Sequence, residues 1–327
     1  MTTSPATPLI TVVTPAYNLG MYIGEAVDSV LRQTFRNFEY LVVDDGSTDE
    51  TVAEVERRAA ADPRLRLIRC DHGGAARARN VGIEEAQGHY IAFLDGDDRW
   101  SAHFLEKQLL LIRQTGDDVA AVFCRSRVMS ESGRVYYAYW QPAGRYDFDD
   151  MLIQSCPPRV GSSLLIKKAA FDQAGLFDLE IESAQDLDMW LRIQRDSNMP
   201  HFWGGRDYLV DVRKRVGAIS RDHDKRFLAL DRLAAQYAPN MKHSPVGMAY
   251  VRAAVFAYRA GADDFADRWA GRARQAGIPR LARDSYGLRL LLWSTLRADQ
   301  RTATRKANAT LRAFLGRAIG AAGGIQR

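Results

Sequence analysis

Cysteine is scarce in this chain of 327 residues, and the few cysteines stand far apart. Cys70, Cys124 and Cys156 are odd in number, and none of them belongs to a Cys-x-x-Cys pair. A disulfide framework and a structural zinc site both need closely spaced cysteines, so the sequence argues against both. We expect three packed thiols in a reducing compartment.

Long apolar runs are missing as well. No stretch approaches the roughly 18 to 20 residues that span a bilayer, and the longest candidate, residues 288–296, is interrupted by Arg289. Residues 1–8 are polar and uncharged, without the basic start and apolar stretch of a secretory signal. We therefore expect a cytoplasmic protein, soluble or peripheral at the inner face of the plasma membrane.

Three nucleotide-related patterns are also absent. A Gly-x-Gly-x-x-Gly turn does not follow the first apolar run, which argues against a dinucleotide oxidoreductase. Residues 13–18 lack the glycine-rich basic loop that is usual in a nucleotidyltransferase. No aromatic and basic sheet motif occurs, and the first part of the chain is acidic, so we expect no nucleic-acid partner.

What is present is a globular composition with an uneven charge. Hydrophobic residues make up 46% and charged residues 26%, the balance of a folded soluble protein. From residue 225 onward there are 19 Lys and Arg against 6 Asp and Glu, a net charge of +13 that leaves −8 for the first 224 residues. An acidic first part and a basic second part predict two surfaces with different partners.

The first half of the sequence alternates strand and helix patterns. Strands are predicted over 9–13, 39–43, 65–70, 90–94 and 119–124. Helices are predicted over 21–32, 75–86 and 101–114, and Ser101 is the expected cap of the helix over 101–114. A further helix is predicted through Val52 and Val55, with Ser47 or Thr48 as its cap. Beyond Ser126 we expect a hairpin at 134–140, a strand at 162–166, a helix at 188–195 and a helical, basic region from 225. The alternation predicts an α/β fold with a mostly parallel sheet flanked by helices.

Acidic residues gather at the predicted strand ends. In such a sheet, ligands bind beyond the carboxyl ends of the strands, which selects residues 14–18, 44–49 and 95–98. Asp95, Asp97 and Asp98 follow one apolar strand within four residues. Hard carboxylate oxygens at this density suit Mg²⁺ or Mn²⁺, although an Asp-Gly turn that merely ends a strand is the alternative for these residues alone.

Four segments in order carry a family resemblance: 12–18 (VVTPAYN), 41–49 (LVVDDGSTD), 78–82 (ARNVG) and 91–100 (IAFLDGDDRW). Together they resemble the family-2 inverting glycosyltransferases, and the resemblance runs from about residue 9 to 220. It implies the GT-A fold and transfer of a sugar from a nucleotide-diphosphate donor.

The resemblance also implies roles for single residues. Pro15, Ala16, Tyr17 and Asp45 match residues that hold the nucleotide base and ribose, while Asp44 either shares that task or supports the loop. Arg79 matches the arginine near the nucleotide.

The acidic segment and the catalytic base are implied in the same way. Asp95 matches the carboxylate close to the ribose and the metal, and Asp97 the one that coordinates the metal. Asp98 is either a supporting partner or the cap of the next turn.

Asp186 matches the base that takes the proton of the acceptor, and capping the following helix is the alternative. Gln185 departs from the usual glutamate. Arg213 and Arg215 match the loop that closes over the diphosphate, with Arg215 standing where the family often has histidine. A solvated basic loop without a ligand is the alternative.

The predicted organisation is a catalytic domain over 1–224 and a helical basic region over 225–327. Residues 311–319 place apolar side chains on one helical face beside Arg312 and Arg317. This helix either packs on the catalytic domain or rests on an anionic membrane.

The predicted function is transfer of a sugar to a saccharide or lipid-linked acceptor in cell-envelope polysaccharide or glycolipid biosynthesis. The resemblance implies that the donor is UDP- or dTDP-linked. An inactive nucleotide-sugar-binding protein and a nucleotidyltransferase are the alternatives.

Overall fold

The computed structural model describes residues 7–153, 158, 160–215, 223–240, 267–269 and 271–272. Two compact units, Met1–Ser244 and Pro245–Arg327, divide the chain. Cys156, Ser220 and the helix predicted over 311–319 lie outside the described residues. Within the described part, no helix combines the length and the apolar composition needed to cross a membrane.

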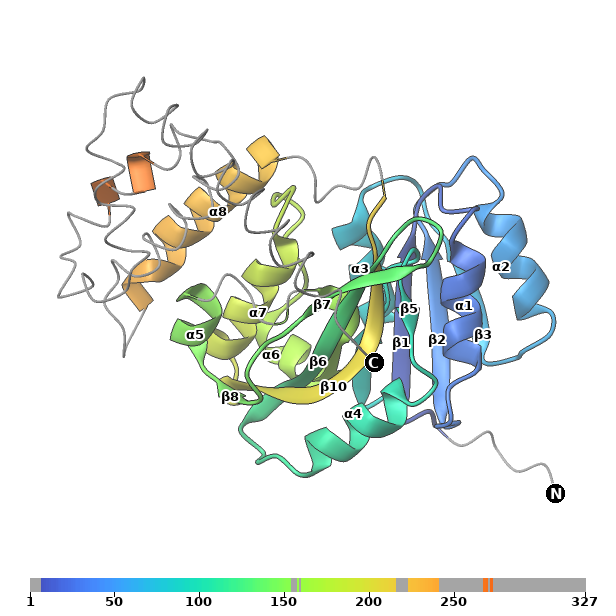
Figure 1. The fold of residues 1–327 in the computed structure, drawn as a ribbon, viewed down its shortest axis with the longest axis horizontal. Coiled ribbons are helices and arrows are strands. Elements are labelled where there is room, and N and C mark those ends of the chain that lie inside the picture. The colour runs from blue at the N-terminus through green and yellow to red at the C-terminus, as the bar shows by residue number, and fades with distance from the viewer. Residues whose placement is uncertain are drawn as a thin grey trace, which may run out of the picture. The chain divides into compact units, whose positions relative to one another are not determined.

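One β-sheet organises the first unit (Figure 1). In the described part of the chain it has ten strands in the order β3-β2-β1-β4-β9-β6-β10-β5, with β7 beside β6 and β8 beside β10. The strands are β1 (Ile10–Ala16), β2 (Phe38–Asp44), β3 (Leu65–Arg69), β4 (Tyr90–Phe93), β5 (Arg99–Trp100), β6 (Val119–Met129), β7 (Val135–Tyr139), β8 (Gly144–Tyr146), β9 (Leu164–Lys167) and β10 (His201–Arg213). The helices are α1 (Ile23–Leu31), α2 (Thr51–Ala59), α3 (Ala75–Glu84), α4 (Phe104–Arg113), α5 (Phe148–Ile153), η1 (Gly161–Ser163), α6 (Lys168–Ala174), α7 (Gln185–Asp196), α8 (His223–Tyr237) and η3 (Ala238–Asn240). The predicted α/β fold class is confirmed.

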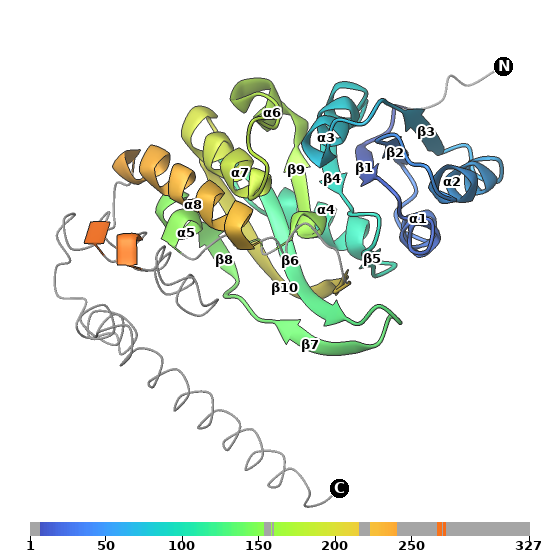
Figure 2. The ribbon, with the colours of Figure 1, turned by 90° about the horizontal axis from the view of Figure 1, so that it is seen from above.

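The half of the sheet formed by β3, β2, β1 and β4 is entirely parallel. Figure 2 shows α3 on one face of this half and α1 and α2 on the other. Every residue of β1 and β2 is buried. Strands that are covered on both faces have continuous apolar sequences, so the strands of this half could be predicted from the sequence.

The other half of the sheet is mixed. β9 lies antiparallel between β4 and β6, while β6 and β10 run parallel to each other. The hairpin predicted within 134–140 is wrong in its extent, because these residues form the single strand β7, which pairs antiparallel with β6 across a turn at residues 130–134. The strand predicted over 119–124 is the first part of the longer β6, and the one predicted over 162–166 begins later, because residues 161–163 form the 3₁₀ turn η1.

The predicted starts of two helices are wrong. α2 begins at Thr51 rather than after Ser47 or Thr48, and α4 begins at Phe104 rather than at Ser101. Ser47 and Thr48 are engaged elsewhere, because Ser47 Oγ accepts from the Asn18 N–H and the Thr48 N–H donates to Asn18 Oδ1. These contacts join the loop after β2 to the loop after β1, so the two loops at the sheet rim hold each other.

A single glycine lets α3 lie close to the sheet. A Cβ atom added at Gly82 would stand 2.3 Å from Cγ1 of Val13 in β1. Contacts of that length do not occur, so a side chain at this position would push α3 outward. The close approach fixes where α3 carries Arg79 and Asn80.

Helix α8 belongs to the first unit and packs on α7. It begins at His223, and its Leu233 and Tyr237 are buried. The phenolic O–H of Tyr237 donates to Asp188 Oδ1 in α7 at 2.6 Å. The division between the units therefore follows α8, at Ser244 and Pro245.

Candidate active site

Two neighbouring aspartates at the end of β2 have different partners. Asp44 is buried, and both of its carboxylate oxygens accept from the Ser47 N–H, at 3.3 and 3.2 Å, which supports the loop. Asp45 accepts from the backbone N–H groups of Gly73 and Gly74, each at 2.8 Å, and lies 2.9 Å from Nδ1 of His72. Asp45 thus fastens the loop between β3 and α3 to the rim of the sheet.

The predicted base-binding segment lies at the carboxyl end of β1. Pro15 and Ala16 are buried within the strand, and Tyr17 directly after it is exposed. The Tyr17 ring lies against the His72 ring, with 4.3 Å between centroids and 31° between planes. The loop after β1 and the loop after β3 therefore form an aromatic surface at this rim, and Asp45 contacts it through His72.

Helix α3 contributes an arginine to the acidic segment after β4. Arg79 Nη2 lies 2.8 Å from Asp95 Oδ1. Burial lowers the pKa of Arg79, but the charges of Asp95 and Asp186 outweigh it and raise the pKa above its ordinary value. Arg79 is thus permanently charged and lies within electrostatic reach of two predicted site carboxylates that are far apart in the sequence.

The next residue of α3 holds the chain that leads to α7. Asn80 Nδ2 donates to the Phe177 carbonyl at 2.9 Å, and Asn80 Oδ1 accepts from the Phe177 N–H at 2.8 Å. Phe177 is buried in the core. This paired contact fixes the segment before α7 relative to α3.

Asp98 is a structural carboxylate. It is 3% exposed, accepts from the Ser162 hydroxyl at 2.7 Å, and accepts from the Arg213 N–H at 3.0 Å. Burial raises its pKa well above the ordinary value, and the charges of Asp97 and Asp95 raise it further. The Ser162 hydroxyl oxygen also accepts from the Asp95 N–H at 3.0 Å. Asp98 therefore joins the acidic segment to η1 and to the end of β10.

Arg213 and Arg215 are two residues apart and have different surroundings. The Arg213 side chain is 1% exposed, and its three nitrogens donate to the Asp97 carbonyl, the Glu131 carbonyl and Glu25 Oε2. We therefore assign it a structural role rather than the predicted contact with the nucleotide-sugar donor. Arg215 Nε lies 2.6 Å from Asp97 Oδ2, and its side chain is partly exposed.

Asp186 lies in the first turn of α7. The N-cap residue is Ala184, with φ 57° and ψ 30°, so Asp186 is inside the helix and does not cap it. The Gln185 side chain donates to the Ile181 carbonyl at 2.7 Å and points back along the chain. A Cβ atom added at Gly161 would lie 3.7 Å from Asp186 Oδ2, so the absence of a side chain there leaves space beside this carboxylate.

Asp95 and Asp97 are the residues that could hold a metal ion. The described residues contain no group of three or more His, Cys, Asp or Glu arranged around one point. Burial and the charge of Asp95 both raise the pKa of Asp97, and the ion pair with Arg215 offsets this only in part. One or two carboxylates completed by phosphate oxygens are the usual ligands of Mg²⁺ or Mn²⁺. The donor set therefore fits such an ion held jointly with a diphosphate.

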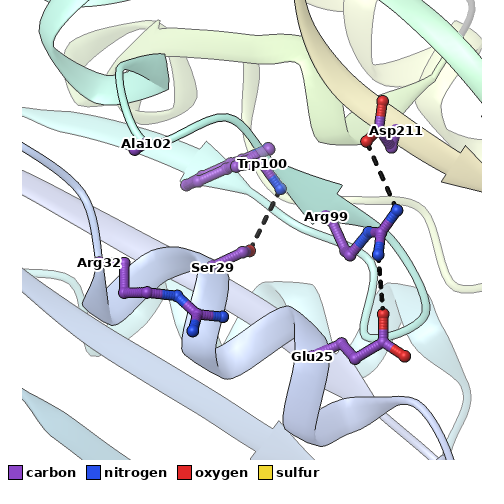
Figure 3. A pocket seen from close by; sticks show the side chains of 7 residues that line it. All are labelled: Glu25, Ser29, Arg32, Arg99, Trp100, Ala102 and Asp211. Carbon is purple, nitrogen blue, oxygen red and sulfur yellow. Dashed lines mark hydrogen bonds and ion pairs between the residues drawn. The ribbon is translucent and has the colours of Figure 1, made fainter. Parts of the chain in front are cut away.

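A cavity of about 480 Å³ lies elsewhere, beside α1 and β5 (Figure 3). Arg99 crosses it and pairs with Glu25 at 3.2 Å and with Asp211 at 3.6 Å. The remaining lining residues are Ser29, Arg32, Trp100 and Ala102. None of the predicted site residues lines this cavity, and its two cations, Arg32 and Arg99, balance its two anions, Glu25 and Asp211, so we do not assign the active site there.

Three supporting residues were missed by sequence reasoning: His72, Asn80 and Ser162. Asn80 lies within the motif at residues 78–82, but the resemblance implied a role only for its neighbour Arg79. His72 follows β3 in a loop whose contact with Asp45 depends on the fold. Ser162 had no local signal, because its partners Asp95 and Asp98 lie more than 60 residues away in sequence.

A parallel half-sheet with acidic and basic side chains at its carboxyl rim, followed by a mixed half that leads to a further carboxylate, is the arrangement of the GT-A fold. The family model Glycosyl transferase family 2 matches residues 11–175. The chain belongs to glycosyltransferase family 2.

Individual relatives agree with this membership. The chain is 31% identical over 215 residues to RP339 of Rickettsia prowazekii (strain Madrid E), an uncharacterized glycosyltransferase, covering 64% of this chain and 65% of the relative. It is 34% identical over 189 residues to TuaG of Bacillus subtilis (strain 168), whose name assigns it to teichuronic acid biosynthesis, covering 57% of this chain and 72% of the relative. The chain spans slightly less than two thirds of RP339.

Solved structures share the fold at low sequence identity. S. aureus TarS 1–349 in complex with UDP-GlcNAc has a TM-score of 0.62 and 20% identity, covering 82% of this chain and 81% of that one. The mannosyltransferase PcManGT from Pyrobaculum calidifontis, in complex with GDP-Man and Mn²⁺, has a TM-score of 0.59 and 22% identity, covering 92% of this chain and 85% of that one.

Proposed function

We propose that this protein transfers a sugar from a nucleotide-diphosphate donor to a hydroxyl group, with inversion at the anomeric carbon and Asp186 as the base. The observation that carries the proposal is the position of Arg79. This arginine pairs with Asp95 at the sheet rim, and the negative charge of Asp186 on α7 raises its pKa. One guanidinium thus links the residues proposed for the nucleotide-sugar donor to the carboxylate proposed for the acceptor.

The proposed reaction is a single displacement. The acceptor oxygen attacks the anomeric carbon, the bond from that carbon to the diphosphate oxygen breaks, and the acceptor proton passes to a carboxylate oxygen of Asp186. Gly161 leaves space beside that carboxylate for the approaching hydroxyl. A Mg²⁺ or Mn²⁺ ion held by Asp95 and Asp97, when bound, would stabilise the charge on the leaving diphosphate. Arg215 is partly exposed beside Asp97 and would bind the same diphosphate.

The proposed site for the nucleoside is the rim formed by Pro15, Ala16, Tyr17 and Asp45. Tyr17 offers an exposed aromatic face, and a carboxylate accepts a base N–H in a charge-assisted hydrogen bond. Asp45 is held by His72, Gly73 and Gly74, so we propose that base binding rearranges this loop. The UDP-GlcNAc complex of TarS supports a UDP- or dTDP-linked donor, and the Mn²⁺ complex of PcManGT supports metal dependence.

We further propose a saccharide or lipid-linked acceptor and a role in cell-envelope polysaccharide or glycolipid biosynthesis. The name of TuaG supports this setting. The +13 charge of residues 225–327 supports a cytoplasmic protein that is peripheral at the inner, anionic face of the plasma membrane.

The decisive experiment compares Asp186→Asn with Asp196→Asn, which changes an exposed carboxylate at the opposite end of the same helix. Purified protein with Mn²⁺ and UDP-GlcNAc or another nucleotide sugar is assayed for release of nucleoside diphosphate and for thermal stabilisation by the nucleotide. We expect Asp186→Asn to abolish release and keep stabilisation, and Asp196→Asn to keep both. Unimpaired release in Asp186→Asn would refute the base.

Two other outcomes identify the alternatives. Stabilisation without release by the wild-type protein, whatever the nucleotide sugar, would indicate an inactive binding protein. Formation of pyrophosphate from a nucleoside triphosphate and a sugar phosphate would indicate a nucleotidyltransferase.

A further inference from the structure

Ser162, the middle residue of η1, has a buried hydroxyl that joins two residues of the acidic segment after β4. Its side chain is 0% exposed. Its O–H donates to Asp98 Oδ2 at 2.7 Å, and its oxygen accepts from the Asp95 N–H at 3.0 Å. A serine hydroxyl has one donor and two lone pairs, so the donor and one acceptor position are in use. The two partners stand on either side of Asp97 in the sequence.

The backbone of η1 is held from the other direction by two buried side chains. Trp100 Nε1 donates to the Ser162 carbonyl at 2.7 Å, and Gln108 Nε2 donates to the Ser163 carbonyl at 2.9 Å. The Trp100 ring is itself stacked on Phe104, with 3.9 Å between centroids and 11° between planes. The Ser162 hydroxyl therefore extends from a backbone that is fixed in place.

The residue before Ser162 lies next to the proposed base. A Cβ atom added at Gly161 would stand 3.7 Å from Asp186 Oδ2. Two consecutive residues of η1 thus adjoin the two parts of the proposed site: Ser162 contacts the acidic segment, and Gly161 lies beside Asp186. The contact between η1 and the acidic segment therefore helps to set the distance between the proposed metal-binding carboxylates and the base.

Loss of the Ser162 hydroxyl would release the acidic segment from η1. The Asp95 N–H would lose this acceptor, and it belongs to the residue whose carboxylate pairs with Arg79 at 2.8 Å. Asp98 would keep its contact with the Arg213 N–H and lose the one with η1. Residues that orient metal ligands in this way are worth about 10- to 100-fold in metal affinity or activity when they are replaced.

Ser163 provides a comparison within the same turn. It is 1% exposed, and its hydroxyl donates to the Val160 carbonyl, three residues earlier, at 2.9 Å. The hydroxyl of Ser162 reaches residues more than 60 positions away instead. The two neighbouring serines thus separate the effect of a buried hydroxyl from the effect of contact with the acidic segment.

We propose that Ser162 is a positioning residue, whose hydroxyl holds the metal-binding carboxylates of the acidic segment at a fixed place relative to Asp186. Because Ser162 is fully buried, it does not touch the sugar or the acceptor, and it acts through Asp95 and Asp98. A misplacement of about 1 Å between reacting groups can slow a reaction about a hundredfold. This proposal rests on the proposed function, because it concerns the spacing of the two parts of that site.

The alternative is that the Ser162 hydroxyl only satisfies the buried Asp98 carboxylate. In that case its removal would lower the stability of the protein and leave metal binding and turnover per folded molecule unchanged. Two quantities that do not depend on the folded fraction distinguish these cases. One is the factor by which Mn²⁺ tightens nucleotide binding, and the other is kcat per nucleotide-binding site.

The test compares full-length wild-type protein with Ser162→Ala and with the control Ser163→Ala. Isothermal titration calorimetry with UDP and with GDP, each without and with saturating Mn²⁺, gives two Kd values, their ratio and the number of binding sites. Release of nucleoside diphosphate from the corresponding nucleotide sugars gives kcat per binding site and KM. Melting temperatures without nucleotide are measured on the same samples.

We expect Ser162→Ala to reduce the Mn²⁺ factor about tenfold or more and to lower kcat per site by a similar factor at saturating nucleotide sugar. Its Kd for the nucleotide without Mn²⁺ should stay that of the wild type. Ser163→Ala should keep the Mn²⁺ factor and kcat. A Ser162→Ala protein that matches Ser163→Ala in both quantities, whatever its melting temperature, would overturn the proposal and leave the proposed function intact. A wild-type protein that neither binds a nucleotide nor releases one would instead refute the proposed function, and this proposal with it.

Discussion

Tyr237 in α8 donates a 2.6 Å hydrogen bond to Asp188, a buried carboxylate one half-turn beyond Asp186 in α7. Asp188 accepts its other contact from Arg192 Nε at 2.8 Å, and Arg192 in turn donates to the Ala174 carbonyl at the end of α6. The helix that carries the proposed base is thus held by two neighbouring helices through one carboxylate.

Tyr237→Phe removes only the hydroxyl from this network. We expect the free energy of unfolding to fall by about 1 to 3 kcal/mol, because a buried charged acceptor loses one of its partners. Urea denaturation of the full-length protein measures the change. Tyr136→Phe removes a hydroxyl from an exposed ring and serves as the control. Equal stability of the two variants would show that the Asp188 contact contributes nothing.

Gly82→Ala and Gly161→Ala make the same chemical change in different surroundings. At Gly82 the new methyl group would meet Val13 at 2.3 Å, and at Gly161 it would make an ordinary contact of 3.7 Å with Asp186. We expect Gly82→Ala to destabilise the fold by about 1 to 3 kcal/mol through overpacking, and Gly161→Ala to change stability by less than about 0.5 kcal/mol.

Under the proposed function, Gly161→Ala should instead slow release of nucleoside diphosphate, because the methyl group narrows the space beside the base. Thermal unfolding and the release assay, run on both variants, check the pair. A Gly82→Ala protein as stable as the wild type would mean that α3 can move outward without lowering the free energy of unfolding.

Asp49 gives a pH-dependent contribution to stability. Burial acts to raise its pKa, but hydrogen bonds from Thr51 and from the Gly20 N–H outweigh it and lower the pKa below the ordinary value. A group whose folded pKa is depressed stabilises the protein above its unfolded pKa, about 3.9 for aspartate, and loses that contribution as the pH falls through the folded value.

Asp49→Asn should therefore lower the melting temperature at pH 7, and its difference from the wild type should shrink as the pH falls below about 4. Calorimetry between pH 3 and pH 7 measures the difference. Asp117→Asn, which changes an exposed carboxylate between α4 and β6, is the control. A difference that stays constant over this range would contradict the assignment.

Asp97→Asn tests the metal-binding role. A ligand that binds only the folded protein stabilises it by about 2.7 kcal/mol at a hundredfold excess over its dissociation constant. We expect UDP with Mn²⁺ to raise the melting temperature of the wild-type protein more than UDP alone. Asp97→Asn should remove the contribution of Mn²⁺, and Asp117→Asn should retain it. Equal contributions of Mn²⁺ in the two variants would exclude Asp97 as a ligand.

The parallel half of the fold was predictable because its strands are buried on both faces. β1 and β2 therefore appear in the sequence as continuous apolar runs. β10 was missed, although it is the longest strand described, because Gly204, Gly205, Arg206 and Asp207 interrupt its apolar pattern and its pairing with β6 shifts register there. A strand with irregular pairing has no simple period, so periodicity cannot reveal it.

The site shows the same contrast between local and distant signals. Asp45, Arg79, Asp95, Asp97 and Asp186 could be selected because short motifs contain them. The difference between Arg213 and Arg215 could not, because it depends on which side chain meets Glu25 and Glu131, residues more than 80 positions away. Partners this distant in sequence are brought together only by the folded sheet.

β6 is one uninterrupted strand of 11 residues, and its first part is buried in the sheet while its last part supports β7. The hairpin is thus an extension of a core strand and carries its exposed rings on a rigid base. Exchanging residues 134–140, which are exposed or partly exposed, would change the outer side chains of the hairpin without repacking the interior, so this part of the surface can evolve independently of the stability of the core.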